Sequence, residues 1–160
     1  MIQSSLTHRL KDQHRTITSI IMPLNDRQIQ QHVIKGKWSI HEQIAHLAKY
    51  QPVFIDRIRK ILMMDNPEFE RYDAEQDDGF EIYCAFTAFE LLKKINHDRE
   101  IIYNLVTKLP PDKFDRTGVH PKLGKMAILD WTEFFLLHEA HHLYAIFQMT
   151  HTVRQFQPSR

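Results

Sequence analysis

Residues 126–149, MAILDWTEFFLLHEAHHLYAIFQM, place apolar side chains at the spacing of one face of an α-helix. His138 and His142 fall in the middle of this face, one helical turn apart. The apolar face around them consists of Trp131, Phe134, Phe135, Ala145, Ile146 and Met149. This stretch therefore predicts a long helix that turns two histidines toward the interior of the protein.

Helical periodicity continues through most of the chain, and helix-start signals mark where further helices begin. A first amphipathic helix is predicted over roughly residues 5–22. Ser39 and Glu42 have the spacing of a capping box, which predicts a second helix over about 40–64. Pro52 lies inside this helix and predicts a kink, because proline cannot donate a backbone hydrogen bond.

A second capping box, Thr87 and Glu90, predicts a third helix that ends at Leu109. Residues 65–80 are acidic, residues 110–125 are rich in proline and glycine, and we expect both to be loops. A connection as long as 65–80 does not force the third helix to lie antiparallel to the second. The sequence thus predicts an all-α four-helix bundle with a long crossover loop between helices two and three.

The composition narrows the class of protein. The 160 residues suit a single domain, 1–160. A formal net charge of +1 gives no sign of the basic surface that binds nucleic acid or anionic lipid. No apolar run has the length of a membrane span, and the N-terminus lacks the apolar core of a secretory signal. A lone cysteine fits the reducing cytoplasm, where we expect the protein. The 11 histidines, against only 4 glycines, favour metal or acid–base chemistry.

His138 and His142 are the first candidates for that chemistry. Two imidazoles at positions i and i+4 of a helix point the same way and can hold one divalent ion. The alternative is a pair of core histidines that hydrogen-bond to buried carbonyl groups. The segment also matches the H-E-x-x-H pattern of zinc proteases, but no acidic residue follows Glu139 to supply a third ligand.

A third ligand must therefore come from earlier in the chain, and spacing alone does not select it. The upstream candidates are His8, His14, His32, His41, His46, His97 and His120. His14 lies on the apolar stripe of the first helix, and His46 lies on the rim of the apolar arc of the second.

Three short motifs resemble one known family. Residues 38–47, WSIHEQIAHL, resemble the W-S-x-x-E-x-x-x-H-L opening of helix two in the DinB/YfiT-like superfamily. Residues 118–126, GVHPKLGKM, look like the loop that precedes helix four in that family, and residues 135–143, FLLHEAHHL, look like its closing helix. The motifs occur in the family's order and cover essentially the whole chain.

This resemblance implies a bundle with a divalent-metal site on His46, His138 and His142, with zinc or nickel as the usual ion. Relatives are frequently dimeric and include thiol transferases, thiol-dependent isomerases and metal-dependent hydrolases. The implied function is an enzyme with an open three-histidine site that acts on a small molecule, in one version a low-molecular-weight thiol. The alternatives are a non-catalytic, metal-stabilised ligand-binding or stress-response protein and a helical interaction protein without metal.

Two residues near the expected ligands are candidates for a catalytic role. Glu139 is adjacent to His138 but about 80° off the apolar stripe, which also suits a residue that orients a ligand or a surface residue. Tyr50 follows His46 by one turn and offers a hydroxyl, although it also suits an aromatic residue at the edge of the core.

Arg99 falls within the apolar face of the third helix. Such an arginine can pair with a carboxylate, extend to solvent or contact an anionic substrate. Separately, apolar residues expected at the surface, Ile101, Tyr103 and Leu143, leave room for a homodimer interface. Finally, histidine binds metal only as neutral imidazole, so an ordinary pKa near ~6.5 predicts metal affinity that falls below about pH 6.

Overall fold

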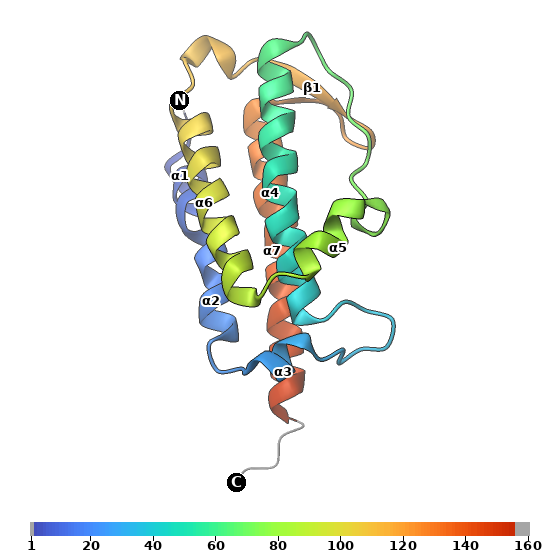
Figure 1. Ribbon diagram of the computed structural model, residues 1–160. Coiled ribbons are helices and arrows are strands. Elements are labelled where there is room, and N and C mark those ends of the chain that lie inside the picture. The colour runs from blue at the N-terminus through green and yellow to red at the C-terminus, as the bar shows by residue number, and fades with distance from the viewer. Residues whose placement is uncertain (1, 156–160) are drawn as a thin grey trace.

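A computed structural model describes residues 2–155 and shows a four-helix bundle (Figure 1). The first bundle helix consists of α1 (Ser4–Asp12), the 3₁₀ turn η1 (Gln13–Arg15) and α2 (Thr16–Ile21), and the others are α4 (Ile40–Met63), α6 (Ala88–Thr107) and α7 (Ile128–Gln155). A short helix, α3 (Asp26–Gln30), connects the first bundle helix to α4. The predicted bundle is thus confirmed.

Both predicted capping boxes are present. The Glu42 backbone N–H donates to Ser39 Oγ at 3.2 Å, and the Glu42 carboxylate accepts from the Ser39 backbone N–H at 2.7 Å. Thr87 and Glu90 make the same reciprocal pair of bonds at the start of α6. Each box satisfies backbone donors that the first turn of a helix leaves free, which fixes where α4 and α6 begin.

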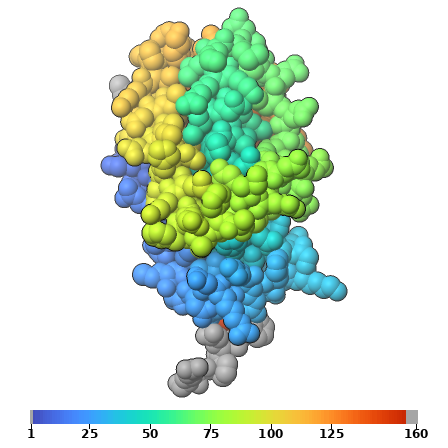
Figure 2. Space-filling model, in the orientation of Figure 1, coloured from blue at the N-terminus to red at the C-terminus, as the bar shows by residue number. Residues whose placement is uncertain are grey.

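The connection from α4 to α6 has more structure than the loop expected for residues 65–80. It contains a 3₁₀ turn, η2 (Ala74–Gln76), and the helix α5 (Asp78–Cys84). The Asp77 carboxylate accepts a hydrogen bond from the Gly79 N–H at 2.8 Å and caps α5, so one of the acidic residues there is a helix-start signal. This connection returns to the end of the bundle where α4 begins, so α4 and α6 run in the same direction (Figure 1). In Figure 2, α5 lies across the middle of the molecule and covers part of α4.

The expectation that residues 110–125 form only a loop is wrong. Strands β1 (Thr117–His120) and β2 (Gly124–Ala127) pair antiparallel in this segment, and a 3₁₀ turn, η3 (Pro111–Lys113), precedes them. Val119 also pairs with the crossover segment, since its N–H donates to the Pro67 carbonyl at 2.8 Å. A small hairpin therefore accompanies the helices, and it closes the end of the bundle where α4 ends and α7 begins (Figure 1).

Gly118 explains how closely this hairpin packs on the bundle. A Cβ atom at this position would lie 2.7 Å from Cε2 of Phe69 and 2.8 Å from Cγ1 of Ile61. Both distances are shorter than real Cβ contacts, so only glycine lets β1 approach α4 and the crossover segment at this distance.

The first predicted helix, 5–22, is interrupted at η1, and α7 continues to Gln155, beyond the predicted end at 149. At the interruption, the Leu10 carbonyl accepts a hydrogen bond from Nη1 of Arg99 at 3.3 Å. The last turns of α7 remain helical because Val153 and its neighbour Thr150 are buried against the rest of the bundle.

A buried ion pair holds the bundle helices together at their centre. Arg99 on α6 and Glu139 on α7 bond to each other, and their side chains are 2% and 1% exposed. Glu139 also accepts a hydrogen bond from Nε2 of Gln13 at 3.0 Å. Arg99 further donates to Oε1 of Gln51 at 3.3 Å and to the Leu10 carbonyl. The pair and its hydrogen-bond partners therefore come from all four bundle helices.

The sequence allows three arrangements for Arg99, and the structure shows the one in which it pairs with a carboxylate. The partner is Glu139, which is therefore a core residue and not a surface residue. Because its carboxylate is occupied by Arg99 and Gln13, Glu139 is not placed to accept a proton from a substrate.

The surface differs from the expectation for a homodimer interface. Leu143 is buried in the core, and Ile101 and Tyr103 are half-buried. The exposed large apolar side chains of α7 are Leu137, Tyr144 and Phe147.

Within residues 2–155, no helix has both the length and the apolar character that crossing a membrane requires.

Replacing Glu139 by alanine should lower the free energy of unfolding by about 3–5 kcal/mol, because Arg99 would keep a buried charge without a counter-charge. Glu133→Ala is the matched control: Glu133 lies on the same helix and pairs with Arg9, but the two side chains are 40% and 37% exposed. This control should cost less than about 1 kcal/mol. Urea unfolding at pH 7 measures both, and equal losses would refute the central role of the buried pair.

Candidate metal centre

Three histidines from two helices meet on one side of the bundle. His46 lies on α4, and His138 and His142 lie one turn apart on α7. One ring nitrogen from each lies within 4.8 Å of the others. Nε2 of His138 is 3.1 Å from Nε2 of His46 and 3.2 Å from Nε2 of His142. The α7 pair predicted to face the interior thus converges with one upstream histidine.

These distances fit a divalent cation between the three rings. Two nitrogens bonded at about 2.0–2.1 Å to one tetrahedral ion lie roughly 3.3–3.4 Å apart, close to the separations between these Nε2 atoms. Neutral imidazole nitrogens whose lone pairs face one another repel unless a proton or a cation lies between them. The donor set therefore has both the spacing and the chemistry of a metal site.

A hydrogen bond with Gln43 fixes the orientation of the His142 ring. Its Nδ1 lies 2.6 Å from Oε1 of Gln43, an acceptor, so Nδ1 carries the proton and Nε2 keeps its lone pair for the centre of the cluster. In the described part of the chain, Nδ1 of His46 and Nδ1 of His138 are buried and have no hydrogen-bond partner. Packing holds these two rings, with the Trp38 ring 5.1 Å from His46.

Burial keeps the three histidines neutral. It lowers the pKa of His46 to about 4, and burial together with the neighbouring histidines lowers the pKa of His138 to about 3 and of His142 to about 2. The expectation that proton competition begins near pH 6 rested on an unperturbed pKa. Burial in this fold shifts protonation of the cluster to a pH lower than that expectation.

A cavity of about 510 Å³ opens above the cluster. Its aromatic walls are Trp38, Tyr50, Tyr72 and Phe134, and its charged residues include Arg57, Arg71, Asp73, Glu75 and Lys122. The residues from 71 to 75 belong to the crossover between α4 and α6, which makes this connection one wall of the site. Sequence reasoning missed Arg57 and the crossover residues, because no periodicity relates them to the histidines.

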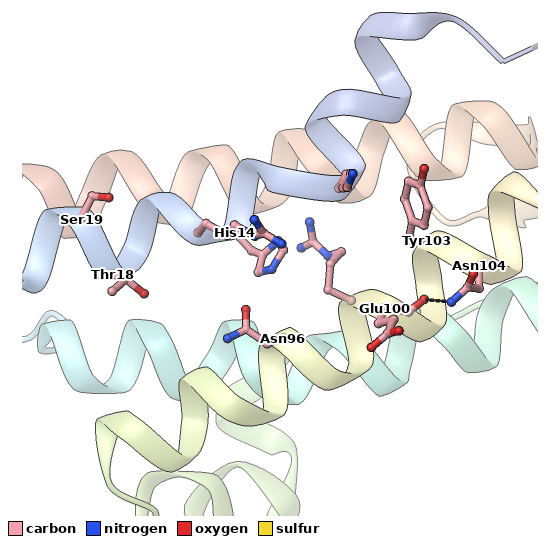
Figure 3. Close-up of a pocket in the computed structure, with 10 residues that line it drawn as sticks. His14, Thr18, Ser19, Asn96, Glu100, Tyr103 and Asn104 are labelled. Carbon is pink, nitrogen blue, oxygen red and sulfur yellow. Dashed lines mark hydrogen bonds between the residues drawn. The ribbon is translucent and has the colours of Figure 1, made fainter.

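The structure places the other predicted residues in different surroundings. Tyr50 lines the cavity, with its ring centre 4.3 Å from that of His138. Arg99 lines a separate cavity of about 870 Å³ between the first bundle helix and α6, shown in Figure 3. Because Arg99 is bonded to Glu139 and lies outside the histidine cavity, the substrate contact predicted for it is not part of this geometry.

The remaining upstream histidines are not among the three converging rings. His14 is buried beside the cavity of Figure 3, and His97 is exposed on α6. Nε2 of His41 bonds to the Phe86 carbonyl at 2.8 Å, which is the core-histidine arrangement considered for His138 and His142. His120 lines the same cavity as the cluster but is not one of the three converging rings.

The fold and the cluster together define a four-helix-bundle protein with a three-histidine centre at the base of an open cavity. Residues 9–146 match the family model of the DinB superfamily, and the chain belongs to this superfamily.

Two proteins of Oceanobacillus iheyensis, each named a "putative metal-dependent hydrolase", are similar to the chain. One is 25% identical over 141 residues, which cover 85% of this chain and 78% of the relative. The other is 26% identical over 125 residues, which cover 75% of this chain and 69% of the relative.

Among solved structures, YfiT from Bacillus subtilis has the same fold. The TM-score is 0.81 at 16% sequence identity, and the match covers 94% of this chain and 89% of YfiT. YfiT is described as a "probable metal-dependent hydrolase with an unusual four-helix bundle topology".

The metal-free protein should lose stability as the pH falls from 7 to 5. In the unfolded chain His46, His138 and His142 titrate near pH ~6.5, whereas in the fold burial lowers their pKa values to about 4, 3 and 2. Below pH ~6.5 the unfolded state therefore binds more protons, and each histidine lowers the free energy of unfolding by up to about 1.4 kcal/mol per pH unit.

Urea unfolding in the presence of a chelator measures this slope. His46→Gln should reduce it, and His97→Gln, which removes a histidine exposed on α6, is the control for loss of a histidine outside the cluster. An identical slope in the wild type and in His46→Gln would show that the cluster is not held neutral by the fold.

Proposed function

We propose that the chain is a divalent-metal-dependent hydrolase in which His46, His138 and His142 hold the ion, with zinc or nickel as the metal. The observation that carries the proposal is the convergence of three Nε2 atoms at metal-ligand spacing under an open cavity. The names of the similar proteins from Oceanobacillus iheyensis support hydrolysis as the reaction class.

Three histidines leave at least one coordination position open, which is the arrangement of a catalytic rather than a structural site. When bound, a divalent ion in such a site supplies Lewis acidity and lowers the pKa of a water or thiol in the open position toward neutrality. Gln43 fixes the proton of His142 on Nδ1, and aromatic side chains line the cavity beside the cluster. Tyr50 places its ring directly beside His138.

Thiol S-transfer is the second reaction that we propose to test. The carboxylates that line the cavity, Asp73 and Glu75, are exposed, and Glu139 is held by Arg99 in the core. The described residues thus place no buried carboxylate in the cavity as a general base. A thiolate needs no such base once it is formed, and it is a soft ligand that suits zinc.

Replacing a proposed ligand should remove the metal without unfolding the bundle. Wild-type protein incubated with zinc and desalted should retain about one ion per chain, and His142→Ala less than about 0.2. The control His141→Ala removes an exposed histidine of the same helix and should retain the full amount. Elemental analysis with circular dichroism measures occupancy and helix content, and tight binding by His142→Ala would refute the ligand assignment.

Activity should depend on the ion and on the same histidines. We expect hydrolysis of p-nitrophenyl acetate at pH 7.5 to fall to the buffer rate after chelation, to return on adding zinc, and to be absent in His46→Ala. The thiol reaction is tested in parallel with cysteine and 1-chloro-2,4-dinitrobenzene, in which the sulfur bonds to the ring carbon and chloride leaves. Hydrolysis that persists after complete chelation would exclude the proposed mechanism, and metal-dependent thiol transfer without hydrolysis would replace it with the second reaction.

A further inference from the structure

Arg57 is a buried cation that has no acidic partner among residues 2–155. It lies on α4, is 6% exposed and lines the cavity above the three histidines. Nη1 donates to the Tyr50 hydroxyl at 3.2 Å, and Nη2 donates to the Glu70 carbonyl at 2.9 Å. Within residues 2–155, no carboxylate oxygen lies within 4.0 Å of its guanidinium nitrogens.

Such an arrangement is costly unless a counter-charge arrives from outside the chain. Removing a guanidinium from water is energetically costly, and neutral hydrogen-bond partners recover only part of this cost. Aromatic rings recover a further part, since the guanidinium carbon lies 5.5 Å from the Trp131 ring centre and 5.6 Å from that of Phe69. The other deeply buried arginine, Arg99, has its carboxylate partner within the chain.

We propose that Arg57 and the Tyr50 hydroxyl form a binding subsite for a carboxylate group of the substrate. One buried, unpaired positive charge matches a monoanion, and a guanidinium presents paired N–H donors that fit a carboxylate. Because Tyr50 accepts a hydrogen bond from Arg57, its own proton is free to donate to the same anion. The substrate of the proposed hydrolase is therefore an acid, and in this respect the inference rests on the proposed function.

The proposed subsite lies in the same cavity as the three histidines. The Tyr50 ring centre lies 4.3 Å from that of His138, and Tyr50 and Arg57 line the same cavity as the three histidines, so a carboxylate bound by them would share this cavity with the cluster. Arg57 lines the same cavity as His120 and His138. A substrate anchored here would present its remaining atoms to the open position above the histidines.

The other charged residues around the cavity do not decide whether it prefers an anionic ligand. Arg71 and Lys122 are cationic, Asp73 and Glu75 are anionic, and all four side chains are exposed, so solvent and salt screen them. Of the charged residues described as lining this cavity, Arg57 alone is buried, and its interaction with an anion in the cavity is correspondingly stronger.

A purely structural role is the competing explanation, because Arg57 ties the crossover segment to α4 through the Glu70 carbonyl. A matched pair of probes separates the two. Benzoate and benzamide have nearly the same shape and differ in charge, and their ring suits the aromatic walls of the cavity. Each is titrated into the full-length chain, both metal-free and zinc-loaded, at constant ionic strength, with binding followed by the NMR shifts of backbone amides.

We expect saturable binding of benzoate that is at least tenfold tighter than that of benzamide, with the largest shifts around residues 50, 57 and 70. Arg57→Met should weaken benzoate binding tenfold or more and leave benzamide within twofold. Tyr50→Phe should weaken benzoate severalfold while preserving the aromatic packing, which keeps the test valid if Arg57→Met does not fold. Arg59→Met, an exposed neighbour on the same helix, is the control and should bind benzoate as the wild type does.

Equal affinities for benzoate and benzamide, or unchanged benzoate binding in a folded Arg57→Met variant, would overturn the subsite. Loss of stability in that variant without loss of benzoate affinity would assign Arg57 a structural role only. The metal-free titration separates this inference from the proposed function. Benzoate binding that depends on Arg57 in a protein that retains no zinc would support the subsite and refute only the metal centre.

Discussion

The buried ion pair between Arg99 and Glu139 is the constraint on which the arrangement of the bundle depends. Its hydrogen bonds reach every bundle helix, and an unpaired charge at this depth would be far more costly than a displaced apolar side chain. The helices therefore keep the register that satisfies the pair. Glu139 directly follows His138, so the same register fixes the side of α7 on which His138 and His142 face α4.

The helices could be predicted because their signals are local. A capping box such as Ser39 and Glu42 is complete within four residues, and the apolar stripe of α7 repeats at every turn. The hairpin could not be predicted in this way, since Gly118 is required by its contacts with Phe69 and Ile61. These contacts join parts of the chain that lie far apart in sequence.

The same contrast between local signals and distant contacts applies to the candidate site. The helical pair His138 and His142 is visible in the spacing, whereas the selection of His46 depends on the family resemblance, because periodicity places His14 on an apolar stripe and His46 only on the rim of one. The histidine pKa values and the isolation of Arg57 follow from burial by packed neighbours. Burial of an individual polar side chain depends on tertiary packing that composition and spacing do not describe.

The crossover between α4 and α6 has a consequence for how such a protein can diverge. It forms one wall of the cavity through Tyr72, Asp73 and Glu75 but contributes none of the three clustered histidines. Substitutions or changes of length in this segment can thus reshape the entrance while leaving the register of the helices intact. The bundle helices α4 and α7 hold the three clustered histidines while a separate connection shapes the entrance, so a change in the connection need not move the cluster.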